Sequence, residues 1–183
     1  MKKIICLAIV LNTSCLFAQE KMVSYKINDE ISYVVPEPFI LMSKGDRIEK
    51  YVSSREPLAM HASVDGEINY GVNWNPMQWI EGDEQMIHDF YKASILSMFD
   101  EVEFIQDEIK EVNGKKFVVF EFVSLLSSEN AFSNKSSRNY TYIQYTSYND
   151  QVLLFNFGCK ARLMNRWQPV ANEIMNSVKV KEK

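Results

Sequence analysis

The 183-residue sequence contains little of what catalytic and metal sites are usually built from. It has three cysteines and two histidines, and His61 and His88 do not form a local metal motif such as His-x-x-x-His. No Gly-x-Ser-x-Gly nucleophile turn, glycine-rich phosphate loop or Cys-x-x-Cys pair occurs. The sequence therefore predicts no cofactor and favours a structural or surface role for both histidines. An enzyme with a site assembled from distant residues, using His61 or His88, is the least favoured alternative.

The sequence also lacks a hydrophobic run long enough to span a bilayer, and its short apolar leader is typical of an export signal. Lys2 and Lys3 precede the apolar residues 4–11, and Ala18 precedes a cleavage site. We predict a signal peptide over residues 1–18 and a single periplasmic or secreted domain over residues 19–183. The competing interpretation is a lipoprotein anchored through Cys15, although Asn12 stands where such signals usually carry leucine.

Disulfides and anionic partners are disfavoured for the mature chain. Cleavage after Ala18 leaves Cys159 as the remaining cysteine, so no intrachain disulfide can form. Cys159 adjoins an apolar strand, which favours a buried structural thiol over a reactive one. The chain carries 24 acidic and 20 basic residues, and removal of the leader makes it more acidic. This charge argues against nucleic acid or anionic lipid as a main partner.

Aromatic and β-branched residues are abundant and predict a sheet-rich core. Two such runs, 140–147 and 151–157, flank a turn at Asn149 and Asp150. Because the second run is apolar on both of its alternating faces, we expect a central antiparallel hairpin covered on both sides. Asn113-Gly114 predicts another hairpin, since both turn positions favour positive φ. The other expected strands span residues 31–36, 58–64, 67–74, 102–112 and 115–123, with a break at Asn75-Pro76.

Helical spacing of apolar residues predicts two helices. The first begins after Asp83 as N-cap and presents one core-facing stripe: Ile87, Phe90, Tyr91, Ser94, Ile95, Met98 and Phe99. The second closes the chain between Leu163 and Val178, and Pro169 either kinks it or lies in the first turn of a helix that begins near Trp167. Residues 47–53 fit a helix or a strand. The expected fold class is α+β, an antiparallel sheet sandwiched between helices in α/β/α layers.

The order of these elements carries a family resemblance. An exported N-terminus and a strand leading to Pro36 precede a hairpin, the first helix, the 108–117 and 140–157 hairpins and a helix ending near Lys179. This order resembles the PsbP-like fold family, which includes the photosystem protein PsbP, the Ran-binding Mog protein and bacterial DcrB-like envelope proteins. The resemblance covers nearly the whole mature chain and implies a docking or assembly role rather than catalysis. It carries over no functional residue.

Two segments are candidate partner surfaces. Trp74, Met77 and Trp79 lie close together before the first helix, and tryptophan is enriched at binding hot spots. The alternative is that they cover the start of that helix, as a hydrophobic staple does. Phe132 and Arg138 lie in a long polar loop, residues 127–139, of the length that is often functional.

Carboxylates cluster between Asp100 and Glu111, but their spacing matches no calcium loop, so a solvated acidic edge is favoured over a metal site. We therefore expect a non-enzymatic envelope adaptor that docks a protein partner through the two candidate segments. The alternative is a protein that binds a lipid or peptide in a pocket between the first helix and the sheet.

Overall fold

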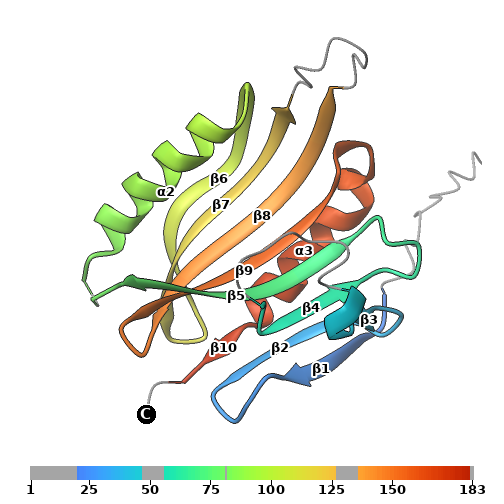
Figure 1. The fold of residues 1–183 in the computed structure, drawn as a ribbon, viewed down its shortest axis with the longest axis horizontal. Coiled ribbons are helices and arrows are strands. Elements are labelled where there is room, and N and C mark those ends of the chain that lie inside the picture. Colours follow the sequence, from blue (N-terminus) through green and yellow to red (C-terminus); the bar gives the residue numbers. More distant parts are fainter. Residues whose placement is uncertain (1–19, 47–55, 81, 127–135, 182–183) are drawn as a thin grey trace, which may run out of the picture.

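A computed structural model describes residues 20–46, 56–80, 82–126 and 136–181 of the chain. Within this part, seven strands form one antiparallel sheet in the order β3-β4-β5-β9-β8-β7-β6 (Figure 1). The strands are β3 (Ile40–Leu41), β4 (Ala59–Ala62), β5 (Asn69–Gln78), β6 (Glu101–Val112), β7 (Lys115–Leu126), β8 (Ser137–Tyr148) and β9 (Gln151–Lys160). The expected hairpin of β8 and β9 lies at the centre of this main sheet, which confirms its predicted place.

The predicted turns have the backbone conformations that their residues favour. Asn113 and Gly114 have φ of 51° and 84°, and they join β6 to β7. Asn149 and Asp150 have φ of 51° and 57°, and they join β8 to β9. Positive φ at both central residues matches the twist of the flanking strands, which is why short turn residues were a reliable sign of these hairpins.

The two expected helices lie on opposite faces of the main sheet, as predicted. Helix α2 (Glu84–Met98) packs over β6 and β7, and helix α3 (Met164–Ser177) packs against β8 and β9. Helix α3 follows the short 3₁₀ helix η1 (Ala161–Leu163) and contains Pro169 in its interior, so the start near Trp167 was wrong. Asp83 occupies the N-cap of α2 without a side-chain capping bond, and its carbonyl oxygen accepts the amide of Ile87 at 3.0 Å.

The core-facing stripe of α2 is narrower than expected. Ile87 and Ile95 are buried, whereas Phe90 and Met98 are 50% and 58% exposed. The helix rests on the β6 and β7 edge of the sheet, so only a central line of side chains is covered. The prediction that Phe90 and Met98 belong to the core was therefore wrong.

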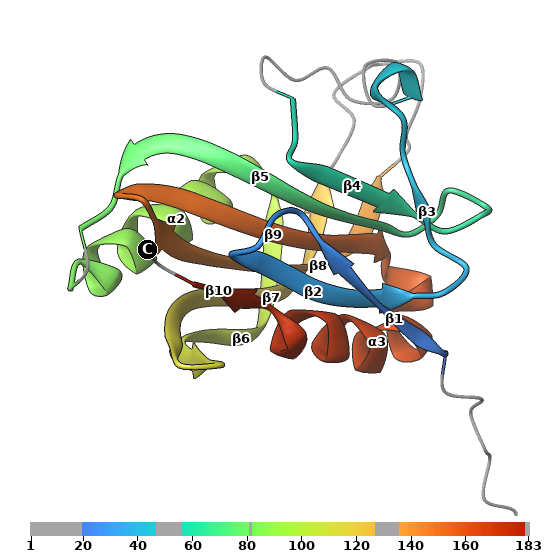
Figure 2. The same ribbon diagram turned by 90° about the horizontal axis from the view of Figure 1, so that it is seen from below.

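A second sheet, which the sequence did not predict, covers the α3 face together with that helix (Figure 2). Its strands are β1 (Met22–Lys26), β2 (Ile31–Pro36) and β10 (Lys179–Val180), in the order β1-β2-β10. One core cluster lies between this layer and the main sheet, and another lies under α2. The result is the expected layered α+β architecture with an additional small sheet.

Two strand boundaries differ from the expectation. Strand β5 continues through Asn75-Pro76 to Gln78, with an irregular register between Asn75 and Gln78. Proline is tolerated there because a bulge removes the need for its missing amide. Strand β8 begins at Ser137, so the predicted loop ends earlier than Asn139. The leader with Cys15, residues 47–53 and residues 127–135 lie outside the described residues.

Candidate functional site

The two candidate partner segments lie at opposite ends of β9. Trp74 pairs with Leu153, whereas Asn139, next to Arg138, pairs with Lys160. The distance from Leu153 to Lys160 along an extended strand is about 23 Å. Arg138 lies 3.8 Å from Glu103 in an exposed ion pair, and Phe132 lies outside the described residues. The structure therefore does not bring the predicted residues into one surface.

Trp79 belongs to the core and not to a surface. It is 2% exposed and lies in the cluster that contains Ile87 and Ile95 of α2. Its amide donates to the carbonyl oxygen of Asp150 at 3.1 Å, and the half-buried Met77 packs against the same cluster. Trp79 thus covers the start of the helix, which was the alternative to the partner-surface prediction. As a partner contact, Trp79 was a wrong prediction.

Exposed apolar side chains gather instead along the chain from β5 into α2. Ile80, Met86 and Phe90 are 64%, 59% and 50% exposed, and we call them the β5–α2 surface. Trp74 does not belong to it, because its cross-strand partner Leu153 and its ring neighbour Tyr148 lie in the core on the α3 face of the sheet. The Phe90 ring packs edge-on against Tyr91 at 5.2 Å, and Tyr91 stacks on the buried Tyr145 at 3.8 Å. Asn75 in β5 also donates to the Tyr91 hydroxyl at 3.4 Å. The Phe90 side chain of this surface is thus held by a row of aromatic rings that ends at the buried Tyr145.

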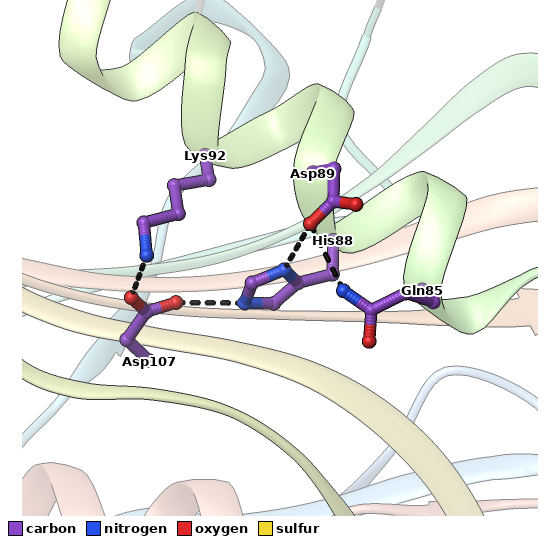
Figure 3. Close-up of polar contacts among 5 residues, drawn as sticks. All are labelled: Gln85, His88, Asp89, Lys92 and Asp107. Carbon is purple, nitrogen blue, oxygen red and sulfur yellow. Dashed lines mark hydrogen bonds and ion pairs between the residues drawn. The ribbon is translucent and has the colours of Figure 1, made fainter.

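His88 lies in a polar network that joins α2 to β6 (Figure 3). Its Nε2 is 2.7 Å from Asp107 Oδ1 and its Nδ1 is 3.0 Å from Asp89 Oδ1. Carboxylates only accept hydrogen bonds, so both contacts are satisfied when the imidazole carries two protons. Lys92 donates to the other oxygen of Asp107. Both nitrogens of His88 thus contact carboxylates, and the contact with Asp107 links α2 to β6. We call this contact the His88 clamp.

The hydrogen-bond partners in this network lower the pKa values of both aspartates. Burial raises the pKa of Asp107, and the hydrogen bonds from Lys92 and His88 outweigh burial and hold that pKa below its ordinary value. Hydrogen bonds from His88 and Gln85 lower the pKa of Asp89 (Figure 3). Both groups are therefore anions at neutral pH. The sequence placed His88 beside Asp89 but could not show Asp107, which comes from the neighbouring strand.

His61 is buried between the two sheets, at 2% exposure. Its Nε2 lies 3.0 Å from the hydroxyl of Tyr33 in β2, and the Tyr25 ring packs edge-on against it at 4.7 Å. Burial lowers the pKa of His61 from 6.5 to about 4, so the imidazole is neutral at pH 7. Tyr33, whose pKa is raised by burial, keeps its proton and donates to Nε2. His61 is thus a satisfied core residue, as favoured from the sequence.

A fully buried carboxylate on β7, Glu121, was missed by the sequence analysis. Tyr140 donates to Oε1 at 2.8 Å, Gln168 of α3 donates to Oε1 at 2.6 Å, and Gln106 donates to Oε2 at 2.6 Å. Three donors compensate for the loss of water around the charge. The signal was present, because Glu121 interrupts an otherwise apolar strand from Phe117 to Val123. The network ties α3 to the centre of the sheet.

Cys159 is buried, and the acidic segment lies on an edge strand, as the sequence predicted. Cys159 is a free, buried thiol, and burial, followed by the charge of Glu67, raises its pKa to about 11. The carboxylates from Glu101 to Glu111 lie on β6, which is the edge strand of the main sheet. Across the described residues, no group of three or more histidine, cysteine, aspartate or glutamate side chains is placed to hold a metal ion.

The layered sheet and the placement of α2 and α3 match solved structures of low sequence identity. Cyanobacterial PsbP (CyanoP) from Synechocystis sp. PCC 6803 superposes with a TM-score of 0.59 at 12% identity, over 93% of this chain and 99% of that chain. This chain has the PsbP-like fold. The Ran-binding protein Mog1p of Saccharomyces cerevisiae has the same fold, with a TM-score of 0.57 at 9% identity over 90% of this chain and 97% of its own.

LpqN, described as involved in cell envelope biogenesis of Mycobacterium tuberculosis, also has the PsbP-like fold. It superposes with a TM-score of 0.53 at 14% identity, over 89% of this chain and 91% of its own. No protein-family model matches this sequence, and no curated protein matches it. At these identities the likeness establishes the fold alone. Among the described helices, none combines the length and the apolar character that a bilayer crossing requires.

Proposed function

We propose that this protein is a non-catalytic, exported docking protein that binds a protein partner through the β5–α2 surface. The observation that supports the proposal most directly is the exposure of three large apolar side chains, Ile80, Met86 and Phe90, between the end of β5 and the middle of α2. Single exposed apolar residues are common on soluble proteins, but gathered ones mark interaction sites. The leader-like N-terminus supports export, and LpqN, a protein with the same fold, is described as involved in cell envelope biogenesis.

The titratable groups in the described part of the chain support a binding role over catalysis. Both nitrogens of His88 contact carboxylates, and Nε2 of His61 is occupied by Tyr33 in the core. The oxygens of Glu121 accept from three side chains. A general acid or base needs an atom within reach of a substrate proton, and these groups are turned toward the protein itself.

The space under α2 favours docking over the alternative of a lipid or peptide pocket between helix and sheet. Ile87 and Ile95 of α2 pack there against Phe120 and Phe122 of β7 and Val152 of β9, all of them buried. Interiors packed in this way leave no room for a second apolar molecule. We therefore propose that a partner binds on the outer side of α2.

Covering the exposed side chains of the β5–α2 surface would contribute to the affinity for a partner. Covering a large apolar side chain is worth about 1.5–3 kcal/mol when the whole side chain leaves water, and about half of that for a half-exposed one. Each serine substitution should then weaken partner binding by about tenfold, since 1.4 kcal/mol corresponds to a factor of ten.

The test is mild cross-linking of the protein in its native envelope, followed by affinity purification and mass spectrometry. We expect a specific protein partner that is lost with Met86→Ser and Phe90→Ser. Ile40→Ser is the matched control, because Ile40 is 56% exposed but lies in β3 at the opposite edge of the sheet. All three variants should keep the melting temperature of the wild type. A partner that is retained by both α2 variants, or lost equally with Ile40→Ser, would refute the proposed surface.

A further inference from the structure

A polar hollow of about 370 Å³ lies where β8 begins and β9 ends, near the beginning of β5. Its side chains point to the face of the main sheet that carries α2, because they alternate with Tyr140 and Cys159, which belong to the core under α3. Helix α2 packs over β6 and β7, and the hollow lies farther along the same face, over β5, β9 and β8. The hollow is thus separate from the β5–α2 surface.

Gly158 lines the bottom of this hollow and has no side chain that would fill it. Gly158 pairs with Asn69 of β5 on one side and with Thr141 of β8 on the other. A Cβ atom added to Gly158 would have the carbonyl oxygen of Tyr140, at 3.9 Å, as its nearest neighbour, which is an ordinary contact. The strand therefore has room for a side chain at this position and carries none. The space remains available to a molecule that lies between Asn69 and Thr141.

Lys160 supplies a positive charge at the rim. Its Nζ donates to Ser137 Oγ at 2.8 Å and to Asn139 Oδ1 at 3.2 Å. No carboxylate of the described residues forms an ion pair with Lys160, whereas Glu67, on the same rim, is paired with Arg162. The lining residues thus carry one charge of each sign, and Arg162, from outside the hollow, neutralises the negative one. Because Asn139 receives the lysine on its oxygen, its amide N–H groups are directed elsewhere and can donate to a ligand.

Two neighbouring side chains on the same face contain buried oxygen atoms without a partner among the described residues. Ser124, which pairs with Asn139, is 1% exposed and its Oγ makes no hydrogen bond. Asn156, two residues before Gly158, has an unpartnered Oδ1. A buried polar group without a hydrogen-bond partner is energetically unfavourable. Neither side chain lines the hollow, so these atoms show that this end of the sheet is polar beyond the lining residues but are not contacts of a ligand.

We propose that this hollow binds a small hydroxylated anion of monosaccharide size, such as a sugar acid or a sugar phosphate. The anionic group binds Lys160, and the hydroxyl groups bind Asn139 and Thr141. Amide and hydroxyl side chains both donate and accept, which suits the hydroxyl groups of a sugar. The volume lies at the lower end of the range of small-molecule sites. The proposal is independent of the docking role.

The test is an NMR titration of the purified protein with glucose 6-phosphate, glucuronate and uncharged glucose. We expect one or both anions to shift the backbone amide of Gly158 and the side-chain amide of Asn139, and glucose to shift neither. Binding of only one anion would identify the group as phosphate or carboxylate. No shift with either anion at about 10 mM, or equal binding of glucose, would overturn the proposal.

Three variants make the test specific to this hollow. Lys160→Met should weaken anion binding by about tenfold or more, since a hydrogen bond to a charged group is worth about 1.5–3 kcal/mol. Lys179→Met, in the exposed part of β10, removes the same charge at the far end of α3 and should have no effect. Gly158→Val should fill the floor and abolish binding without lowering the melting temperature, because valine suits a strand. Equal effects of Lys160→Met and Lys179→Met would overturn the proposal.

Discussion

Acidification should weaken this fold through His61 before its perturbed carboxylates begin to titrate. The pKa of His61 is lowered by burial from 6.5 to about 4, so the unfolded chain takes up a proton at a higher pH than the folded chain does. The stability that the neutral imidazole contributes is present above pH 6.5 and is lost as the pH falls toward 4. Asp65, Asp89 and Asp107 have pKa values lowered from 3.8, so they remain ionised in this window.

The size of the effect follows from the separation of the two pKa values. Between pH 7 and pH 5 the unfolded imidazole becomes almost fully protonated while the folded one stays neutral, which costs about 2 kcal/mol of the free energy of unfolding. Protonation of the folded state would place a cation between Tyr25, Tyr33 and Tyr70, where the second sheet meets the main sheet. The junction of the two sheets is therefore the part that acid should loosen.

The assay is urea unfolding of the wild type and His61→Gln at pH 7 and pH 5. Glutamine keeps a group that can bind the Tyr33 hydroxyl but does not titrate, so this variant should lose about 2 kcal/mol less than the wild type between the two pH values. For a slope of about 2 kcal/mol per molar urea, the midpoint of the wild type falls by about 1 M more than that of the variant.

His88→Gln is the matched control, because it removes the other histidine and should leave the His61 effect in place. Equal loss of stability by the wild type and His61→Gln between pH 7 and pH 5 would refute the argument from burial.

Three further predictions concern the polar networks and the buried thiol. Glu121→Ala should cost about 3 kcal/mol or more in denaturant unfolding, because Tyr140, Gln106 and Gln168 lose their acceptor, and Glu121→Gln should cost less. Equal losses in the two variants would show that the acceptor is unimportant. Asp107→Asn should lower the free energy of unfolding by about 1–2 kcal/mol by loosening His88 and Lys92, and a change as small as that of the exposed Asp29→Asn would contradict the clamp. Cys159, with a pKa of about 11, should react with a thiol reagent at pH 8 far more slowly in the folded than in the urea-unfolded protein, and similar rates would contradict its burial.

Much of the fold could be predicted from local signals. The turns at Asn113-Gly114 and Asn149-Asp150 follow from residues that tolerate positive φ, and the helices follow from apolar spacing. The strand β9 is apolar on both faces, so two covering layers were required before any contact was known. The burial of the Cys159 thiol also agreed with the sequence, because this residue adjoins an apolar strand.

The candidate sites depended on contacts between distant segments. Trp74 and Trp79 are five residues apart, yet Trp74 is 41% exposed and Trp79 is 2% exposed. Trp74 lies beside Tyr148 on the α3 face of the sheet, whereas Trp79 packs in the core cluster under α2. The hollow at Gly158 exists because β5 and β8 align Asn69 and Thr141 beside it. Register across strands has no signature in a single sequence, so these placements could not be predicted.

The sequence by itself thus determined the elements, their turns and the need for a covered sheet, since these depend on the conformations and hydrophobicity of neighbouring residues. The second sheet was decided only by the tertiary structure, because β10 reaches β2 from the opposite end of the chain. The same holds for the β5–α2 surface, the His88 clamp and the polar hollow. Each depends on which residues meet across elements, and that is set by packing of the whole domain.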